Sequence, residues 1–126
     1  MKKRIQAYLF LFFIGSLIHV YHNYIPLWML KGTYVNTNYE YGHFIAEIPY
    51  GQDSLTLHAD KTFSSTYWGE GQYEISYSLY GTKLHLPYNE KLRVSGLNTT
   101  IKRRFFSSAR IILVDDRYHY MRKIKD

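Results

Sequence analysis

The sequence predicts an all-β domain, an antiparallel meander of about eight strands that forms a small barrel or a strongly curled sheet, preceded by an N-terminal hydrophobic helix. Three observations predict this fold. Apolar and polar residues alternate with a period of two through much of the chain after residue 30. Tyrosine is unusually frequent, with 14 among 126 residues, and aromatic enrichment between Gly and Asp turns favours strands. A basic cap precedes a long apolar run at the N-terminus.

The N-terminal helix is predicted from Lys2, Lys3 and Arg4, which lead directly into the apolar residues 5–18. This run is shorter than the about 20 residues that span a bilayer core. The chain continues to residue 30 through a stretch rich in Tyr and Trp, which is typical of a membrane–water interface. Residues 1–30 are therefore predicted to be a membrane anchor or a signal segment.

An uncleaved anchor is the favoured interpretation of this segment. A signal-peptide cleavage site needs small residues after the apolar run, but Gly15 and Ser16 lie inside it and no A-x-A pattern precedes Lys31. A lipoprotein signal is excluded because the chain has no cysteine. The alternatives are a cleaved signal, or a soluble protein in which the segment forms a buried hydrophobic arm.

The distribution of charge predicts the orientation. Three basic residues stand on the N-terminal flank, and the first basic residue on the other side is Lys31. The basic flank stays in the cytoplasm, so the C-terminal domain is predicted to lie outside. Cleavage would instead yield a secreted or periplasmic domain. Without cysteine, no disulfide stabilises that domain.

Residues 31–126 are long enough for one small domain. No Pro, Gly or Ser-rich linker divides them. The formal charge of +6 falls to +3 when the three N-terminal basic residues are set aside, since 13 basic residues then face 10 acidic ones. This small excess is mainly a matter of solubility.

The first strands are predicted at residues 32–35 and 43–48, followed by a hairpin over residues 53–68 that turns at residues 59–61. Leu55 and Leu57 share one face of its first strand. Phe63, Ser65 and Tyr67 share one face of the returning strand.

The second half of the meander begins after Trp68-Gly69-Glu70-Gly71, whose two glycines predict a break in the strand pattern. A third strand is expected over residues 73–79. A turn at Gly81-Thr82 leads into a fourth strand, which Pro87 ends or places at an edge.

The C-terminal part is predicted to close the meander. Residues 92–106 contain a strand pair or one long bent strand, with the break at 96–98. Residues 111–114 and 118–121 flank Asp115-Asp116 and predict a closing hairpin before the basic tail.

The chain resembles the small lipocalin-like barrels found as exported domains in bacterial proteins of unknown role. The resemblance covers about residues 31 to 125 and rests on four segments: Gly32-Thr33-Tyr34, the hairpin at 57–63, the corner at 68–73 and the strand at 118–124. Tyr34 stands where lipocalins have the Trp of their Gly-x-Trp opening. The resemblance implies a barrel and an interior cavity.

Rows of aromatic side chains are the candidate lining of a ligand site. Such a site would hold an apolar molecule between these rows and Leu84 and Leu86. The alternative is that these side chains fill the interior, which is favoured because they are large and the domain is small. The candidate residues are Tyr34, Phe63, Tyr67, Tyr73 and Tyr77.

Lys102, Arg103 and Arg104 form a dense basic cluster that is followed by Phe105 and Phe106. Such a mixture can bind nucleic acid or anionic lipid. In a strand, however, alternate residues face opposite ways, so the charges divide between two faces. A solvated edge strand protected by charge is the favoured interpretation. Contact with lipid or a partner is the alternative, and no nucleic acid is expected.

No catalytic, metal or cofactor site is expected. His19 and His22 lie three residues apart on one helical face, but no carboxylate or cysteine near them completes a metal site. Asp115 and Asp116 occupy a predicted turn, where Asp is common for local hydrogen bonding.

The predicted function is therefore non-catalytic: a single-pass membrane protein with an outward β domain of binding or structural type. One alternative is a secreted or surface protein that recognises or inhibits a protein partner through exposed aromatics. A carrier of a small apolar ligand is another. The aromatics named for partner recognition are Tyr39, Tyr41, Tyr50 and Tyr88.

Overall fold

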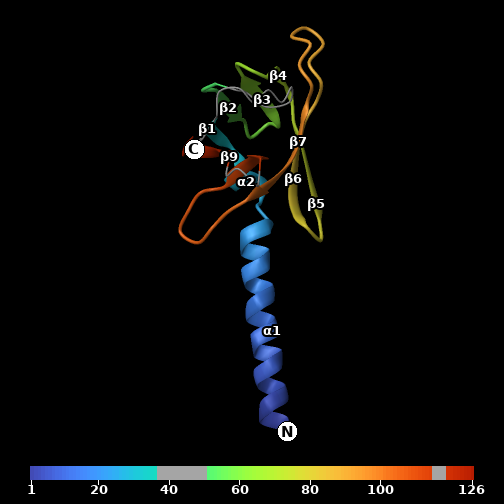
Figure 1. Ribbon diagram of the computed structural model, residues 1–126, viewed down its shortest axis with the longest axis vertical. Coiled ribbons are helices and arrows are strands. Elements are labelled where there is room, and N and C mark those ends of the chain that lie inside the picture. Colours follow the sequence, from blue (N-terminus) through green and yellow to red (C-terminus); the bar gives the residue numbers. More distant parts are fainter. Residues whose placement is uncertain (37–50, 115–118) are drawn as a thin grey trace.

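A computed structural model describes residues 1–36, 51–114 and 119–126 and shows a β domain on top of one long helix (Figure 1). The helices are α1 (Lys2–Asn23) and the short α2 (Leu27–Leu30). The strands are β1 (Gly32–Asn36), β2 (Ser54–Leu57), β3 (Thr62–Ser65), β4 (Gly69–Gln72), β5 (Glu74–Ser78), β6 (Gly81–Leu86), β7 (Leu97–Lys102), β8 (Arg110–Val114) and β9 (His119–Lys125).

The nine described strands form one antiparallel sheet in the order β4-β3-β2-β1-β9-β8-β7-β6-β5. Strand β1 joins the two halves because it hydrogen-bonds both β2 and β9. The outermost strands β4 and β5 are consecutive in the chain, with Tyr73 alone between them. The sheet therefore curls until its edges meet at one residue, and the predicted all-β, barrel-like meander behind a hydrophobic helix is confirmed.

The core lies inside this curled sheet and comes from alternate residues of its strands. The pattern is clearest in β1, where every second residue is buried, and in Leu55 and Leu57 of β2. The largest fully buried side chains are Trp68, Tyr34 and Tyr73, and aliphatic residues surround them. Two core residues, Ile25 and Leu30, come from the segment between α1 and β1 rather than from the sheet.

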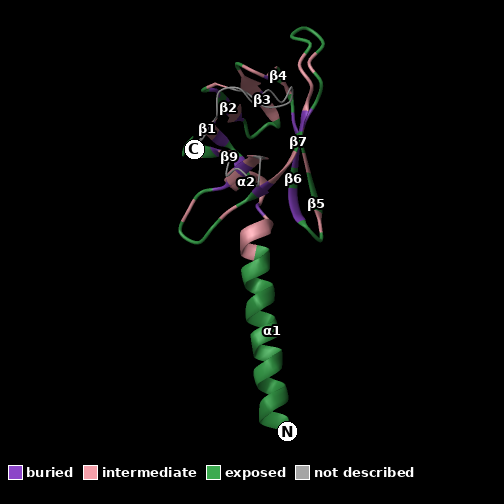
Figure 2. Cartoon of the chain, in the orientation of Figure 1, coloured by how far each residue is buried: buried purple, intermediate pink, exposed green. Residues whose placement is uncertain are grey.

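Helix α1 extends away from the domain, and none of its residues is buried (Figure 2). Within the described residues it is the helix that is long and apolar enough to cross a membrane, and a signal sequence would meet the same criteria. The alternative of a hydrophobic arm buried in the domain is wrong, because large side chains such as Phe10 and Phe12 remain exposed.

Several predicted elements need correction. The glycines at 69 and 71 lie inside strand β4 rather than in a break. Glycine stands at 71 because a Cβ there would lie 3.1 Å from the ring of Phe63, so the residue type reflects packing and not a turn. Residues 92–106 contain one strand, β7, which begins at the expected break. The two predicted hairpins at 53–68 and 73–86 are confirmed as β2–β3 and β5–β6. The strand predicted at 43–48 and residues 115–118 lie outside the described residues.

Candidate functional site

The junction between helix and domain, residues 19–31, is rich in hydrogen bonds between distant parts of the chain. Helix α1 ends at Asn23, and the chain enters the core at Ile25 without a linker. The last four carbonyl groups of a helix have no partner within the helix and need one elsewhere. In this protein the backbone N–H of Tyr24 donates to the first of them, the carbonyl of Val20, at 2.9 Å.

Donors from strand β6 and from the segment after β7 bond the remaining three carbonyls. The backbone N–H of Arg103 donates to the carbonyl of His22 at 2.9 Å. The side-chain Nε of Arg103 donates to the carbonyl of Tyr21. The hydroxyl of Thr82 donates to the carbonyl of Asn23 at 2.8 Å. All four terminal carbonyls of α1 thus have a partner, three of them from the β domain.

Arg103 is the side chain that joins most parts of the junction. Besides Tyr21, its guanidinium contacts the sulfur of Met29 at 3.1 Å and lies 4.0 Å from the centre of the Tyr21 ring. A cation at a helix C-terminus also interacts favourably with the helix dipole. The planar fork of Arg can make these contacts at once, which the point charge of Lys cannot.

The turn between β5 and β6 packs directly against the end of α1. Thr82 accepts a hydrogen bond from the backbone N–H of Ile25 at 2.9 Å while it donates to Asn23. Gly81 has a φ of 116°, and a Cβ at this position would lie 2.8 Å from the carbonyl oxygen of Asn23. Only glycine fits so close an approach in this left-handed conformation.

Aromatic side chains bond across the same boundary. The hydroxyl of Tyr24 donates to the carbonyl of Ser78, and that of Tyr77 donates to the carbonyl of Ile25 at 2.9 Å. On the opposite side, the Phe105 ring stacks on Tyr21 with ring centres 5.1 Å apart and meets His22 edge-on at 4.7 Å. The junction is therefore held from two sides.

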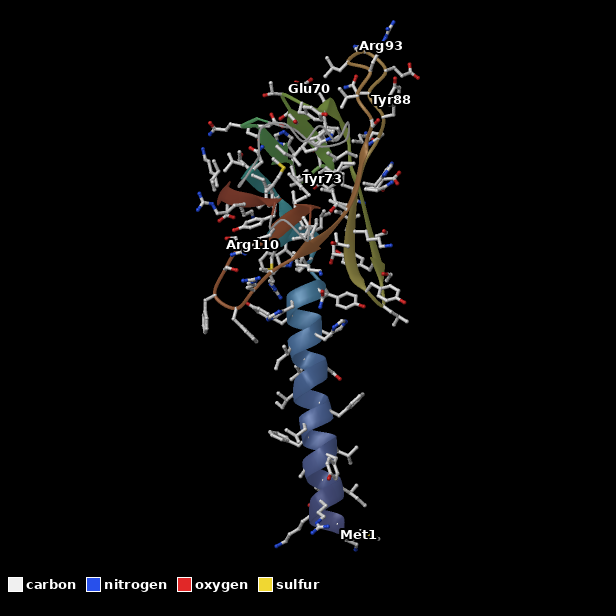
Figure 3. The ribbon with its side chains drawn as sticks, viewed as in Figure 1. Met1, Glu70, Tyr73, Tyr88, Arg93 and Arg110 are labelled. Atoms are coloured by element: carbon white, nitrogen blue, oxygen red, sulfur yellow. The ribbon has the colours of Figure 1, made fainter. Side chains whose placement is uncertain are left out.

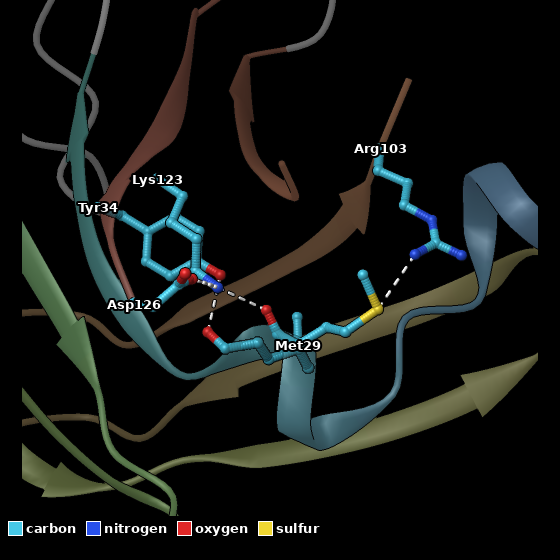
Figure 4. Close-up of polar contacts among 6 residues, drawn as sticks. Met29, Tyr34, Arg103, Lys123 and Asp126 are labelled. Carbon is cyan, nitrogen blue, oxygen red and sulfur yellow. Dashed lines mark hydrogen bonds and ion pairs between the residues drawn. The ribbon is translucent and has the colours of Figure 1, made fainter. Parts of the chain in front are cut away.

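A third contact comes from the C-terminal strand β9 (Figure 4). Lys123 donates to the carbonyl of Met29 at 2.7 Å and forms an ion pair with Asp126 at 3.0 Å. The hydroxyl of Tyr34 donates to the carbonyl of Leu30 at 2.7 Å. Burial raises the pKa of Tyr34 well above its ordinary value. The hydrogen bond and charge of Lys123 lower the pKa of Asp126.

The structure places the five residues predicted to line a ligand site in different surroundings. Tyr34, Phe63 and Tyr73 are buried in the core, so they fill the interior. Tyr67 is partly buried and packs edge-on against Trp68, with ring centres 5.3 Å apart. Tyr77 is 53% exposed and belongs to the junction.

Two open hollows lie over strands β3 and β4, and Phe63 borders both of them. One is lined by Phe63 and Trp68 together with Tyr88 and its neighbours in the loop after β6, and the other by His58, Phe63 and Gln72. Glu70 and Tyr88, which line the first hollow, lie at the end of the domain farthest from α1 (Figure 3). We call this end the distal end. Tyr39, Tyr41 and Tyr50 lie outside the described residues.

The basic cluster is divided by the structure in an unexpected way. Strand β7 lies between β6 and β8, so the prediction of a solvated edge strand at Lys102 to Arg104 is wrong. The strand ends at Lys102, and Arg103 turns onto the helix terminus. Lys102 and Arg104 are exposed, as are Phe105 and Phe106.

The histidines at the junction have structural contacts. His19 Nε2 lies 3.4 Å from the carbonyl oxygen of Leu79, and its Nδ1 lies 3.3 Å from the amide nitrogen of Asn23. His22 packs on Phe105. Among the residues that the structure describes, no group of three His, Cys, Asp or Glu side chains is placed to hold a metal ion.

No protein-family model, curated protein or solved structure matches this chain. The junction residues that sequence reasoning did not single out are Tyr24, Gly81, Thr82 and Lys123. The aromatic residues at 21–28 indicate a membrane–water interface in this part of the sequence. The residues that bond it lie 50 to 100 positions away in the chain, and no local pattern identifies them.

Proposed function

We propose that this protein is a single-pass membrane protein whose apolar helix α1 is retained and holds a non-catalytic β domain directly at the membrane surface. The observation that carries the proposal is the complete capping of the α1 terminus by Arg103, Thr82 and the Tyr24 amide. The helix of a cleaved signal sequence leaves the mature domain, so bonds between the two would be lost on cleavage. Here helix and domain form one continuous structure.

The same junction argues against a cleaved signal segment. Ile25 and Leu30 are completely buried in the domain core, and both precede the first strand. Cleavage at the C-terminal end of the segment would remove these apolar side chains and expose the cavity that they fill. It would also leave Tyr77 and Tyr34 without the carbonyl groups to which they donate.

The role of the domain is proposed to be structural or surface binding rather than ligand transport. Its interior holds the buried side chains of Tyr34, Tyr73 and Trp68, which supports this proposal over a ligand carrier. The distal end carries exposed Tyr88 and Leu92 beside an open hollow. This arrangement favours recognition of a protein partner there as the second candidate function.

The proposed orientation places Lys2, Lys3 and Arg4 in the cytoplasm and the β domain outside. Because the natural chain has no cysteine, single cysteines report on it directly. In intact spheroplasts, a membrane-impermeant maleimide is expected to label the Tyr88→Cys variant at once. It is expected to label the Lys3→Cys variant only after lysis. The reverse pattern would contradict the orientation, and equal labelling of both before lysis would contradict membrane insertion.

A further inference from the structure

Two loops at the junction carry exposed apolar side chains on either side of the end of α1. The β5–β6 turn presents Leu79 and Tyr80, which are 87% and 81% exposed. The β7–β8 connection presents Phe105 and Phe106, and Phe106 is fully exposed. Figure 1 shows both loops reaching toward the helix, away from the distal end. We call these four residues the apolar tips.

The tips lie level with the last turns of α1. The carbonyl oxygen of Leu79 is 3.4 Å from His19, and the ring of Phe105 stacks on Tyr21. Both loops therefore reach the part of the helix at residues 19–22. Each loop exposes two neighbouring large apolar side chains, and exposed apolar patches of this kind mark contact with a membrane or a partner.

The length of α1 places this level at the membrane surface. Its uninterrupted apolar residues 5–18 rise about 21 Å at 1.5 Å per residue, against about 30 Å of hydrocarbon. A span of about 20 residues counted from Ile5 ends at Tyr24. The hydrocarbon core therefore ends between residues 19 and 24, nearer residue 19 if the bilayer thins locally to match the shorter apolar run. The tips lie beside these residues.

The charge around the tips is of one sign. The three segments that build this end of the molecule, residues 19–31, 77–83 and 102–110, contain no Asp or Glu. They contain six basic residues: Lys31, Lys83, Lys102, Arg103, Arg104 and Arg110. Asp126, next to Lys31 in space, is already paired with Lys123. Basic residues at a membrane surface attract anionic headgroups, and aromatic rings favour the interface.

We propose that the apolar tips insert into the headgroup region of the leaflet on the domain's side of the membrane, with Lys102 and Arg104 contacting anionic lipid headgroups. The domain then stands on three supports, α1 and two loops, and its distal end points away from the bilayer. This inference rests on the proposed membrane anchor. It adds a second membrane contact that fixes the tilt of the domain.

The capping of the junction fits this location. In the hydrocarbon core no water is present to satisfy free backbone carbonyl groups, so partners within the protein suit the carbonyls that lie at its boundary. The carbonyls of residues 20–23 all have one, as do those of Ile25, Met29 and Leu30. A junction that stood in water would need fewer of these bonds, because water could serve exposed carbonyl groups.

The test uses single-cysteine variants of the full chain in vesicles of phosphatidylcholine and phosphatidylglycerol. Phe106→Cys and Tyr80→Cys probe the tips, and Tyr88→Cys is the matched control, an exposed aromatic at the distal end. Each carries an environment-sensitive fluorophore. At the tips we expect blue-shifted emission that is quenched by brominated lipid and protected from aqueous iodide. At position 88 we expect the emission of a label in water.

Three outcomes are decisive. If labels at 80 and 106 behave as the label at 88 while the protein still floats with the vesicles, the tips do not enter the membrane and the inference fails alone. If the protein does not float with the vesicles, the proposed anchor fails. If the tip labels are blue-shifted but brominated lipid does not quench them, a protein surface covers the tips, and membrane insertion is wrong.

Discussion

At the scale of single residues, Arg103 carries the largest share of the link between helix and domain. It is only half-buried, yet it bonds the carbonyl of Tyr21, contacts Met29 and lies over the Tyr21 ring. A hydrogen bond from a charged group contributes about 1.5–3 kcal/mol. Its neighbours Lys102 and Arg104 are exposed, so the three basic residues provide an internal comparison.

We expect Arg103→Met to lower the free energy of unfolding of the full chain in detergent micelles by about 1–3 kcal/mol. The loss follows from the freed carbonyl of Tyr21, and Arg103→Lys should restore only part of it. Denaturant titration measures the change. Arg104→Met is the control and should change stability by less than about 0.5 kcal/mol. Equal effects at both positions would contradict the assignment.

The raised pKa of Tyr34 predicts how the free energy of unfolding depends on pH above pH 10. Its folded-state pKa is raised by burial above the ordinary value of 10.0, so the unfolded chain loses this proton first. Between the two values the folded state binds more protons, and stability falls as pH rises, by up to about 1.4 kcal/mol per pH unit. Below pH 10 this contribution is fully present.

Tyr34→Phe removes this titration, so its unfolding free energy should fall less steeply above pH 10 than that of the natural chain. Denaturant unfolding at a series of alkaline pH values measures the slope. The variant also loses the bond to Leu30, which lowers stability at all pH values without changing the slope. Tyr88→Phe controls for the loss of an exposed phenol. An equal change of slope in both variants would be evidence against the account.

At the scale of elements, the β5–β6 turn acts as a clamp on the helix because Gly81 lets the backbones approach. We expect Gly81→Ala to destabilise the chain by about 1–3 kcal/mol, since alanine is strained at a φ of 116° and its Cβ would meet Asn23. Thermal unfolding in micelles measures the loss. Gly51→Ala is the control, because no described atom lies within 4 Å of a Cβ there. A neutral Gly81→Ala would show that the turn does not clamp α1.

The buried side chains of the strands fill the interior of the sheet, and a second pair of variants tests this packing. Leu84 on β6 is fully buried, whereas Leu92 in the distal loop is 50% exposed. Leu84→Ala should cost about 2–5 kcal/mol through the cavity that it leaves. Leu92→Ala should cost much less. If Leu84→Ala lowers the free energy of unfolding only slightly and the folded variant binds an apolar dye, the natural chain has a cavity. That result would support the carrier hypothesis.

The sequence predicts elements well where side chains alternate and poorly where contacts are distant. The hairpins β2–β3 and β5–β6 follow from alternation, for example Leu55 and Leu57 facing the core. The two glycines predict a break where the structure has strand β4, because Gly71 makes room for Phe63, a contact that local sequence does not reveal. The role of Arg103 depends on α1, which precedes it by 80 residues, so its charge alone suggested a solvated strand.

At the scale of the whole molecule, the two ends of the domain differ. The junction end carries α1, the apolar tips and basic residues, and the distal end carries Arg93 and an open hollow lined in part by Tyr88 (Figure 3). The sheet between the two ends is strongly curled, so that its outermost strands β4 and β5, each paired on one side among the described strands, adjoin at Tyr73.

The central claim is that α1 is retained as an anchor continuous with the β domain. The most direct measurement is the intact mass and membrane association of the full chain after expression in a bacterial host. The account predicts a chain of the full 126 residues that stays in the membrane after carbonate washing and whose β domain is open to external protease. A shortened, soluble chain that begins after residue 18 would contradict it.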